Sequence, residues 1–217
     1  MPYVKLGRYK FDCNLCETRC DGKSKDEYIF DHDSNFSEAV EKEIINLINS
    51  TYKNLIAVKT FNKGYPDLEI KKKNASEETL LFIEVKVQQR AFMSIQKQLP
   101  LSGLIPSETV ALNLSDLERY FEIKDKEQKP IFVVWCLMKR PCINGPNEAG
   151  RRYFSQEIDF LRKIRLKDKN SSRRFRRASG KGDVVNGEHK GVVVNYHFSL
   201  NELFEGLPEL SLLDFED

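Results

Sequence analysis

Residues 80–88, "LLFIEVKVQ", constrain the fold more than any other stretch of the chain, because their side chains alternate in character. Alternation with a period of two is typical of a β-strand whose two faces have different surroundings. One face then carries Leu81, Ile83, Val85 and Val87, and the other carries Phe82, Glu84, Lys86 and Gln88. Glu84 and Lys86 lie side by side, about 7 Å apart along the strand. The chain must therefore build a sheet that has charged groups on one face.

The flanking segments predict a succession of helices and strands around this strand. Apolar residues at helical spacing predict a helix from Ser34 or Ser37 to about Ser50. Strands are expected at 54–61, 67–73, 79–88, 129–138 and 191–200, and helices at 91–98, 114–123, 154–166 and 201–210. This order predicts an α/β or α+β fold, with a mixed central sheet flanked by helices.

Length and composition predict one well-buried core without a membrane span. The 217 residues are 40% hydrophobic and 31% charged. The longest apolar run, at 131–138, is too short to cross a bilayer, and the charged N-terminal stretch does not resemble a signal peptide. We therefore expect a cytoplasmic protein with reduced cysteines. The expected division is an N-terminal extension at 1–33, a core at 34–140, and a basic C-terminal part at 141–217 packed on the same domain.

Acidic residues on the preceding strand suggest a site beside Glu84. Asp67 and Glu69 share one face of the strand at 67–73. If that face pairs with the face of Glu84 and Lys86, carboxylates from two strands meet next to an ammonium group. Hard oxygen ligands in this arrangement suit Mg²⁺. The alternative is a solvated sheet face with an ordinary Glu84–Lys86 ion pair.

The residues "PD" at 66–67 and "EVK" at 84–86 resemble the PD-(D/E)XK nuclease superfamily, which includes restriction endonucleases and archaeal Holliday-junction resolvases. The resemblance covers roughly residues 34–138. It implies that Asp67 and Glu84 bind Mg²⁺ and that Lys86 positions the nucleophilic water. "EKEIINLI" at 41–48 resembles a first-helix motif whose glutamate completes the metal site. Glu41 fits that spacing best, whereas Glu43 lies nearer the apolar stripe of the helix.

The same resemblance implies an activity. It predicts hydrolysis of DNA phosphodiesters to 5′-phosphate and 3′-hydroxyl ends, with Gln88 as a further polar residue of the site. A type II restriction endonuclease acting as a homodimer is the leading interpretation. A resolvase-like enzyme, another defence nuclease, and a non-catalytic zinc-containing nucleic-acid-binding protein remain alternatives. The sequence leaves the recognition site and the choice between DNA and RNA open.

A basic block is the second feature that indicates a nucleic acid. Residues 161–181 contain ten Lys or Arg and one acid, a net charge of +9. Because the whole chain carries +2, the remainder carries −7. A block this basic predicts a polyanionic partner. Within it, four arginines are expected to contact the DNA backbone, unless the run is a solvated loop: Arg173, Arg174, Arg176 and Arg177.

Three cysteines near the N-terminus raise the possibility of a structural metal. Cys13, Cys16 and Cys20 have near-zinc spacing, and His32 or Cys142 is a candidate fourth ligand. Ordinary thiols and an iron–sulfur cluster are the alternatives. Zn²⁺ is therefore an expected second cofactor only if these residues converge.

Overall fold

A computed structural model describes residues 5–15, 30–89, 91–145, 150–178, 184–185, 188–189 and 191–214. Within these ranges, a six-stranded sheet forms the centre of the molecule, in the order β13-β8-β7-β5-β4-β3. β5 and β7 pair in parallel, and the other neighbours are antiparallel. The bounds are β3 Leu55–Lys59, β4 Leu68–Lys72, β5 Ala75–Gln88, β7 Ile131–Met138, β8 Arg151–Glu157 and β13 Phe204–Glu205.

A second sheet of three strands packs beside the first. β12 lies in its middle and pairs antiparallel with β6 and β9. The bounds are β6 Thr109–Asn113, β9 Arg174–Ala178 and β12 Val192–Ser199. Two short antiparallel pairs complete the described strands: β1 Lys5–Gly7 with β2 Lys10–Phe11, and β10 Val184–Val185 with β11 Glu188–His189.

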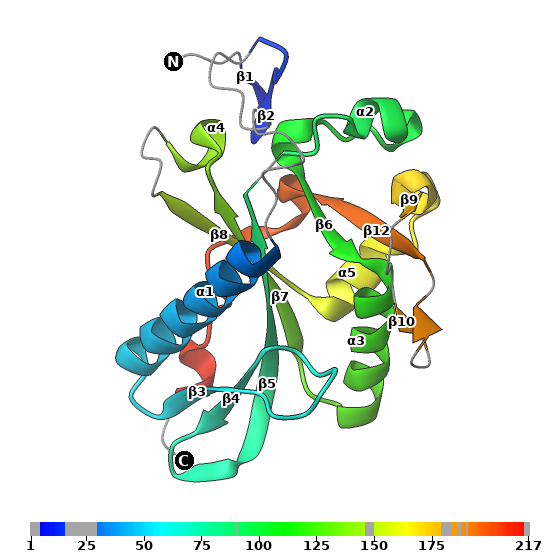
Figure 1. The fold of residues 1–217 in the computed structure, drawn as a ribbon. Coiled ribbons are helices and arrows are strands. Elements are labelled where there is room, and N and C mark those ends of the chain that lie inside the picture. Colours follow the sequence, from blue (N-terminus) through cyan, green and yellow to red (C-terminus); the bar gives the residue numbers. More distant parts are fainter. Residues whose placement is uncertain are drawn as a thin grey trace.

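Helices cover both faces of the six-stranded sheet (Figure 1). The α-helices are α1 Phe30–Thr51, α2 Ile95–Gln98, α3 Leu114–Glu127, α4 Pro141–Asn144 and α5 Ile158–Arg165. Short 3-10 turns occur at Pro100–Ser102, Pro106–Glu108, Asp168–Arg173, Leu200–Glu202 and Ser211–Leu213. The fold is thus α+β with a mixed central sheet between helices, which confirms the predicted fold class.

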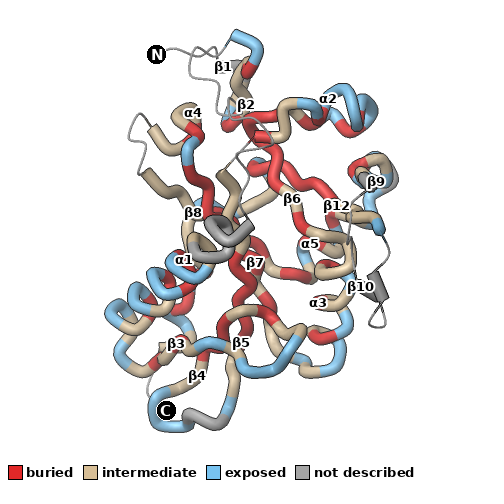
Figure 2. Tube along the Cα trace, viewed as in Figure 1, coloured by how far each residue is buried: buried red, intermediate tan, exposed pale blue. Residues whose placement is uncertain are grey.

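The core consists of two layers, one on each face of the sheet. α1 contributes Val40, Ile44 and Ile48 to the first layer, against the alternate residues of β5 that include Ile83 and Val85. The second layer joins the opposite face to α3, α5, β6 and β12, with Trp135 of β7 fully buried in it. β7 is buried along almost its whole length (Figure 2), because it lies inside the sheet and is covered on both faces.

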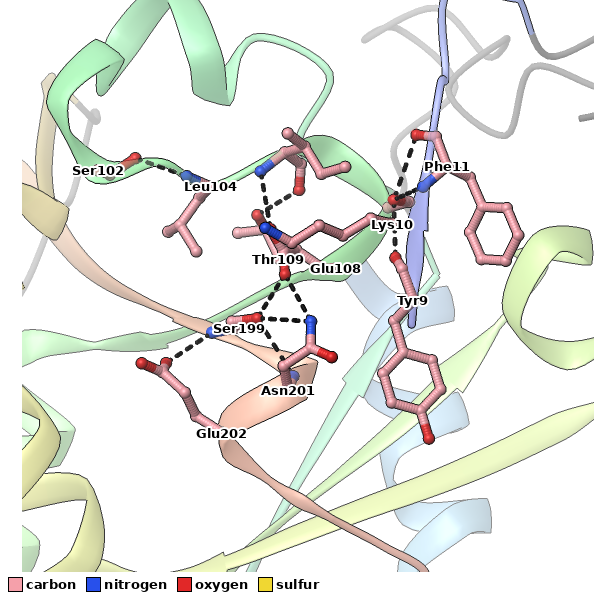
Figure 3. A network of polar contacts seen from close by, with 12 residues as sticks. Tyr9, Lys10, Phe11, Ser102, Leu104, Glu108, Thr109, Ser199, Asn201 and Glu202 are labelled. Carbon is pink, nitrogen blue, oxygen red and sulfur yellow. Dashed lines mark hydrogen bonds and ion pairs between the residues drawn. The ribbon is translucent and has the colours of Figure 1, made fainter. Parts of the chain in front are cut away.

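A buried polar network fastens the N-terminal hairpin to the C-terminal part of the chain (Figure 3). Glu108 is 1% exposed and accepts hydrogen bonds from Ser199 and Asn201, at 2.5 and 2.8 Å. Lys10 forms an ion pair with the same carboxylate at 3.4 Å. A buried carboxylate needs such partners, since desolvation otherwise makes its charge costly. The network therefore holds segments far apart in sequence together.

Several local predictions differ from the structure. Residues 151–157 form β8 rather than the start of a helix, because they pair with β7 along their whole length; only the part from Ile158 is helical. The helix expected at 201–210 is wrong, since the segment contains only the end of a 3-10 turn and the short strand β13, and its remainder is irregular. The helix expected at 91–98 is confined to α2. β6 is not among the expected strands, and two strands of the central sheet, β8 and β13, come from residues after 140.

Candidate active site

The pairing of β4 with β5 brings Asp67 and Glu84 together. Leu68 lies opposite Ile83 in this antiparallel pair, so the register places Asp67, one residue before β4, opposite Glu84. Ile83 and Val85 pack into the layer beneath α1, while Phe82 packs into the layer on the α3 side. Side-chain alternation then directs Glu84 towards α3. The two strands therefore pair with their acidic faces together, which is the condition that the sequence analysis left open.

Asp67 lies at the start of β4 and is tied to β5. Its Oδ2 accepts a hydrogen bond of 2.8 Å from the backbone N–H of Val85. Burial raises the pKa of Asp67 to about 7, and the negative charges of Glu84 and, to a smaller extent, Glu41 act in the same direction. The carboxylates thus stand close enough to repel one another.

Glu84 and Lys86 form the second part of the site. Glu84 is 2% exposed, and its Oε1 lies 2.6 Å from Lys86 Nζ. Lys86 Nζ also lies 3.3 Å from Asp116 Oδ2. Burial alone would lower the pKa of Lys86, but Glu84 and Asp116 outweigh it and hold that pKa above its ordinary value. Lys86 is consequently a fixed ammonium group between two carboxylates.

The first turns of α3 supply residues that sequence reasoning missed. Asp116 accepts a hydrogen bond from Arg119 at 2.8 Å, and Arg119 Nε donates to the carbonyl of Gly64 at 2.7 Å. The Tyr120 hydroxyl lies beside Glu84; burial, followed by that negative charge, raises the pKa of Tyr120. An acid in a helical first turn ordinarily indicates only a favourable helix dipole. No spacing in the sequence connects it with Lys86.

α1 presents Glu41, and not Glu43, to this region. Glu41 is 6% exposed and its Oε2 lies 3.1 Å from Lys59 Nζ, at the end of β3. Glu43 points elsewhere, because it accepts a hydrogen bond from Tyr153 at 2.6 Å and forms an ion pair with Arg151. Of the two glutamates that the sequence left open, only Glu41 lies near Asp67.

Gln88 follows Lys86 on the same face of β5, two residues further along. Its Nε2 donates to the carbonyl of Thr109 at 3.1 Å. The fully buried Arg140 donates to the same carbonyl at 3.3 Å. This contact joins β5 to the start of β6, so Gln88 lies at the boundary of the site rather than in its centre.

The acidic residues suit a hard divalent cation. Within the described residues, no group of three or more His, Cys, Asp and Glu side chains is arranged to hold a metal ion. Mg²⁺, however, is commonly bound by one or two carboxylates together with water and substrate phosphate. Glu84 Oε2 is a buried oxygen without a hydrogen-bond partner in the described structure. The negative charges of Glu84 and Glu41 also act on the carboxyl group of Asp67. A cation there would relieve that repulsion.

The other predicted residues are placed only in part. Cys13 is buried, and Cys142 packs against the second core layer. Cys16, Cys20 and the side chain of His32 lie outside the described residues, so the zinc hypothesis stays a prediction. Among the described cysteines there is no disulfide.

Within the basic block, the segment 174–178 is the edge strand β9 and not a loop. Arg174 and Arg176 are exposed and lie on the same face of β9. Arg173 differs: it is 7% exposed and forms a 2.6 Å ion pair with Glu202. The side chain of Arg177 lies outside the described residues. Phe175 packs against the small cluster around Ile95 and thereby anchors the strand. Of the four arginines, Arg174 and Arg176 are thus exposed, and their contact with DNA stays a prediction.

Comparisons with known proteins give little further information. No protein-family model matches the sequence, and no curated protein matches it. Among solved structures, a nuclease from a fusselovirus is similar over 87% of this chain and 94% of its own, at 11% identity and a TM-score of 0.38. A similarity with so low a TM-score does not assign a function. In the part of the chain that the structure describes, no helix has the length and apolar character of a membrane span.

The raised pKa of Asp67 predicts how stability depends on pH in the metal-free protein. Because the folded state holds this proton more tightly than the unfolded state, stability falls as the pH rises from about 4 to about 7. Asp67→Asn removes this dependence. Relative to wild type, the variant should gain about 2 kcal/mol between pH 5 and pH 8 in urea unfolding with EDTA.

Asp125→Asn provides a control, because the pKa of Asp125 is shifted in the opposite direction to that of Asp67. A hydrogen bond from Arg162 lowers the pKa of Asp125, so its replacement brings no gain with rising pH. If Asp67→Asn gains nothing over wild type between the two pH values, Asp67 is not the partly buried group repelled by neighbouring carboxylates that is described above.

Proposed function

We propose that the protein is an Mg²⁺-dependent nuclease whose site consists of Asp67, Glu84 and Lys86. The observation that carries this proposal is the meeting of two carboxylates from paired strands on one sheet face, with an ammonium group fixed 2.6 Å from one of them. An ordinary solvated ion pair does not bury one carboxylate to 2% exposure beside a second. Such crowding disfavours the metal-free state and favours a cation-bound one.

Each residue has a distinct role in this proposal. Asp67 and Glu84 provide oxygen ligands, and Glu41 provides a third acidic group at the side of α1. The metal, when bound, supplies charge neutralisation at the phosphodiester and a water of lowered pKa. Lys86 carries a positive charge that orients the attacking water and stabilises charge developing on the phosphate oxygens. Asp116 keeps that ammonium group in place, through its contact at 3.3 Å.

The substrate we propose is DNA, cut to 5′-phosphate and 3′-hydroxyl ends. The exposed Arg174 and Arg176 of β9 are suited to contact phosphates without regard to sequence. Within this class we favour a type II restriction endonuclease that acts as a homodimer, since cleavage of both strands calls for two such sites. A Holliday-junction resolvase is the alternative, and it would cut a synthetic four-way junction in preference to a linear duplex.

Removal of the lysine tests the chemistry. Lys86→Ala should lower Mg²⁺-dependent cleavage of supercoiled plasmid at least about 100-fold, because charge stabilisation in the transition state is lost. DNA affinity, measured by fluorescence anisotropy with Ca²⁺ in place of Mg²⁺, should persist. Lys86→Arg keeps the charge but not its geometry. It separates loss of activity from loss of folding, and should also cleave poorly.

Lys71→Ala is the matched control for this experiment. Lys71 forms a comparable pair with Glu69, at 2.8 Å on the neighbouring strand β4, but lies outside the site. The control should cut like wild type, and EDTA should abolish cleavage by both. Near-wild-type cleavage by Lys86→Ala would show that the site is assigned wrongly.

The exposed arginines of β9 give a second prediction. Replacing Arg174 and Arg176 together with Ala should weaken binding to every DNA sequence alike. Because the double variant can no longer neutralise two phosphates, the slope of log K against log salt should fall by about 2 units. Lys42 and Lys53, exposed on α1 and just after it, provide a charge-matched double variant that should leave the slope unchanged. A selective loss at one preferred sequence would instead assign these arginines to base reading.

A further inference from the structure

The loop between β3 and β4 presents an exposed phenylalanine beside the candidate active site. Phe61 is 98% exposed, more than any other large apolar residue described. Its neighbour Thr60 donates a backbone hydrogen bond of 2.9 Å to the carbonyl of Asp67. Phe61 therefore follows a residue whose backbone is hydrogen-bonded to the backbone of Asp67, a proposed metal ligand.

The loop is held in place, so this exposure does not result from a loose segment. Tyr65 N donates to Asn62 O at 3.1 Å, which closes a turn within the loop. Gly64 has a φ of +86°, a conformation that favours glycine, and its carbonyl accepts from Arg119 of α3. Figure 1 shows the loop extending from β3 towards α3.

The same loop separates its two aromatic side chains. Tyr65 packs edge-on against Phe82, with ring centroids 5.6 Å apart, and its hydroxyl bonds to Glu127. Phe61, four residues earlier, faces solvent. The loop thus uses one aromatic ring as its anchor in the core and leaves the other ring exposed, one residue after the backbone contact of Thr60 with Asp67.

Lysines flank the exposed ring. Lys59 is 56% exposed at its side chain, and Lys63 is exposed. Cationic groups that contact phosphates, together with an aromatic ring that stacks on a base, are the combination by which proteins bind unpaired nucleotides. A ring with an exposed lysine two residues away on each side in the sequence suits a polyanionic ligand better than a lipid or an apolar protein surface.

We propose that Phe61 stacks on a nucleobase next to the phosphate that is cut. The ligand is a base that has left its neighbours in the stack, in single-stranded or locally distorted nucleic acid. This inference rests on the proposed nuclease function and extends it: the loop 60–66 selects a nucleotide that is unpaired or easily unstacked. Lys59 and Lys63 hold the flanking backbone.

A tryptophan placed at this position reports stacking directly. Phe61→Trp is made in the Lys86→Ala background with Ca²⁺, so that no substrate is consumed. The protein's own Trp135 is fully buried and gives a constant background. Addition of a duplex with a short mismatched bubble should quench the new fluorescence saturably, at the concentrations where anisotropy detects binding. Phe61→Ala should weaken binding to this probe by roughly 5- to 100-fold.

Leu101→Trp and Leu101→Ala are the matched controls. Leu101 is 83% exposed but lies in the 3-10 turn Pro100–Ser102. This turn is distant from Asp67 in the sequence and is not paired with the strand that follows Asp67. The fluorescence of Leu101→Trp should not be quenched, and Leu101→Ala should bind the probe with unchanged affinity. Binding without quenching at position 61, and with full affinity in Phe61→Ala, overturns the inference while the nuclease proposal stands. Failure to bind any nucleic acid overturns both. Self-association that depends on Phe61 would assign the ring to a contact between copies of the chain, and the inference would be wrong.

Discussion

The register between β4 and β5 is the constraint on which the site depends. With Leu68 opposite Ile83, Asp67 stands opposite Glu84, and the backbone N–H of Val85 fixes the Asp67 carboxylate. A shift of one residue would exchange the two faces of a strand. Glu84 would then enter the apolar layer beneath α1, and aliphatic residues would face α3. Packing of α1 against the strand therefore protects the position of the acidic groups.

Charge balance explains how the site is stable without a metal. The ammonium group of Lys86 lies between Glu84 and Asp116, and Arg119 neutralises Asp116 from the other side. At Asp67, burial and the charge of Glu84 outweigh the hydrogen bond from Val85 and the attraction of Lys86, and they raise the pKa of this carboxyl to about 7. The negative charges are thus neutralised on the side of α3, whereas the carboxylates on the side of Asp67 repel one another. This asymmetry is what a divalent cation would remove.

Much of this arrangement can be predicted from the sequence, because strand alternation is a strong local signal. It indicates the two faces of β5 and the hairpin partner β4, and apolar residues at helical spacing indicate the helix that carries Glu41. The contributions of Asp116 and Arg119 could not be predicted, since contacts between α3 and β5 depend on tertiary packing. The helical wheel favours Glu43 because it lies nearer the apolar stripe, but Tyr153 and Arg151 of β8 draw that side chain away. β8 itself is predicted in part as helix, because pairing with β7 is not visible in a local pattern.

In the proposed site, Asp67 and Glu84 together bind a divalent cation. Anomalous diffraction from crystals grown with Mn²⁺ tests it most directly, since the ion is located without assuming any activity. We expect an anomalous peak about 2.0–2.3 Å from a carboxylate oxygen of each residue, absent in Asp67→Asn crystals. A structure at saturating Mn²⁺ with no peak beside Asp67, and with Lys86 still paired to Glu84, would contradict it.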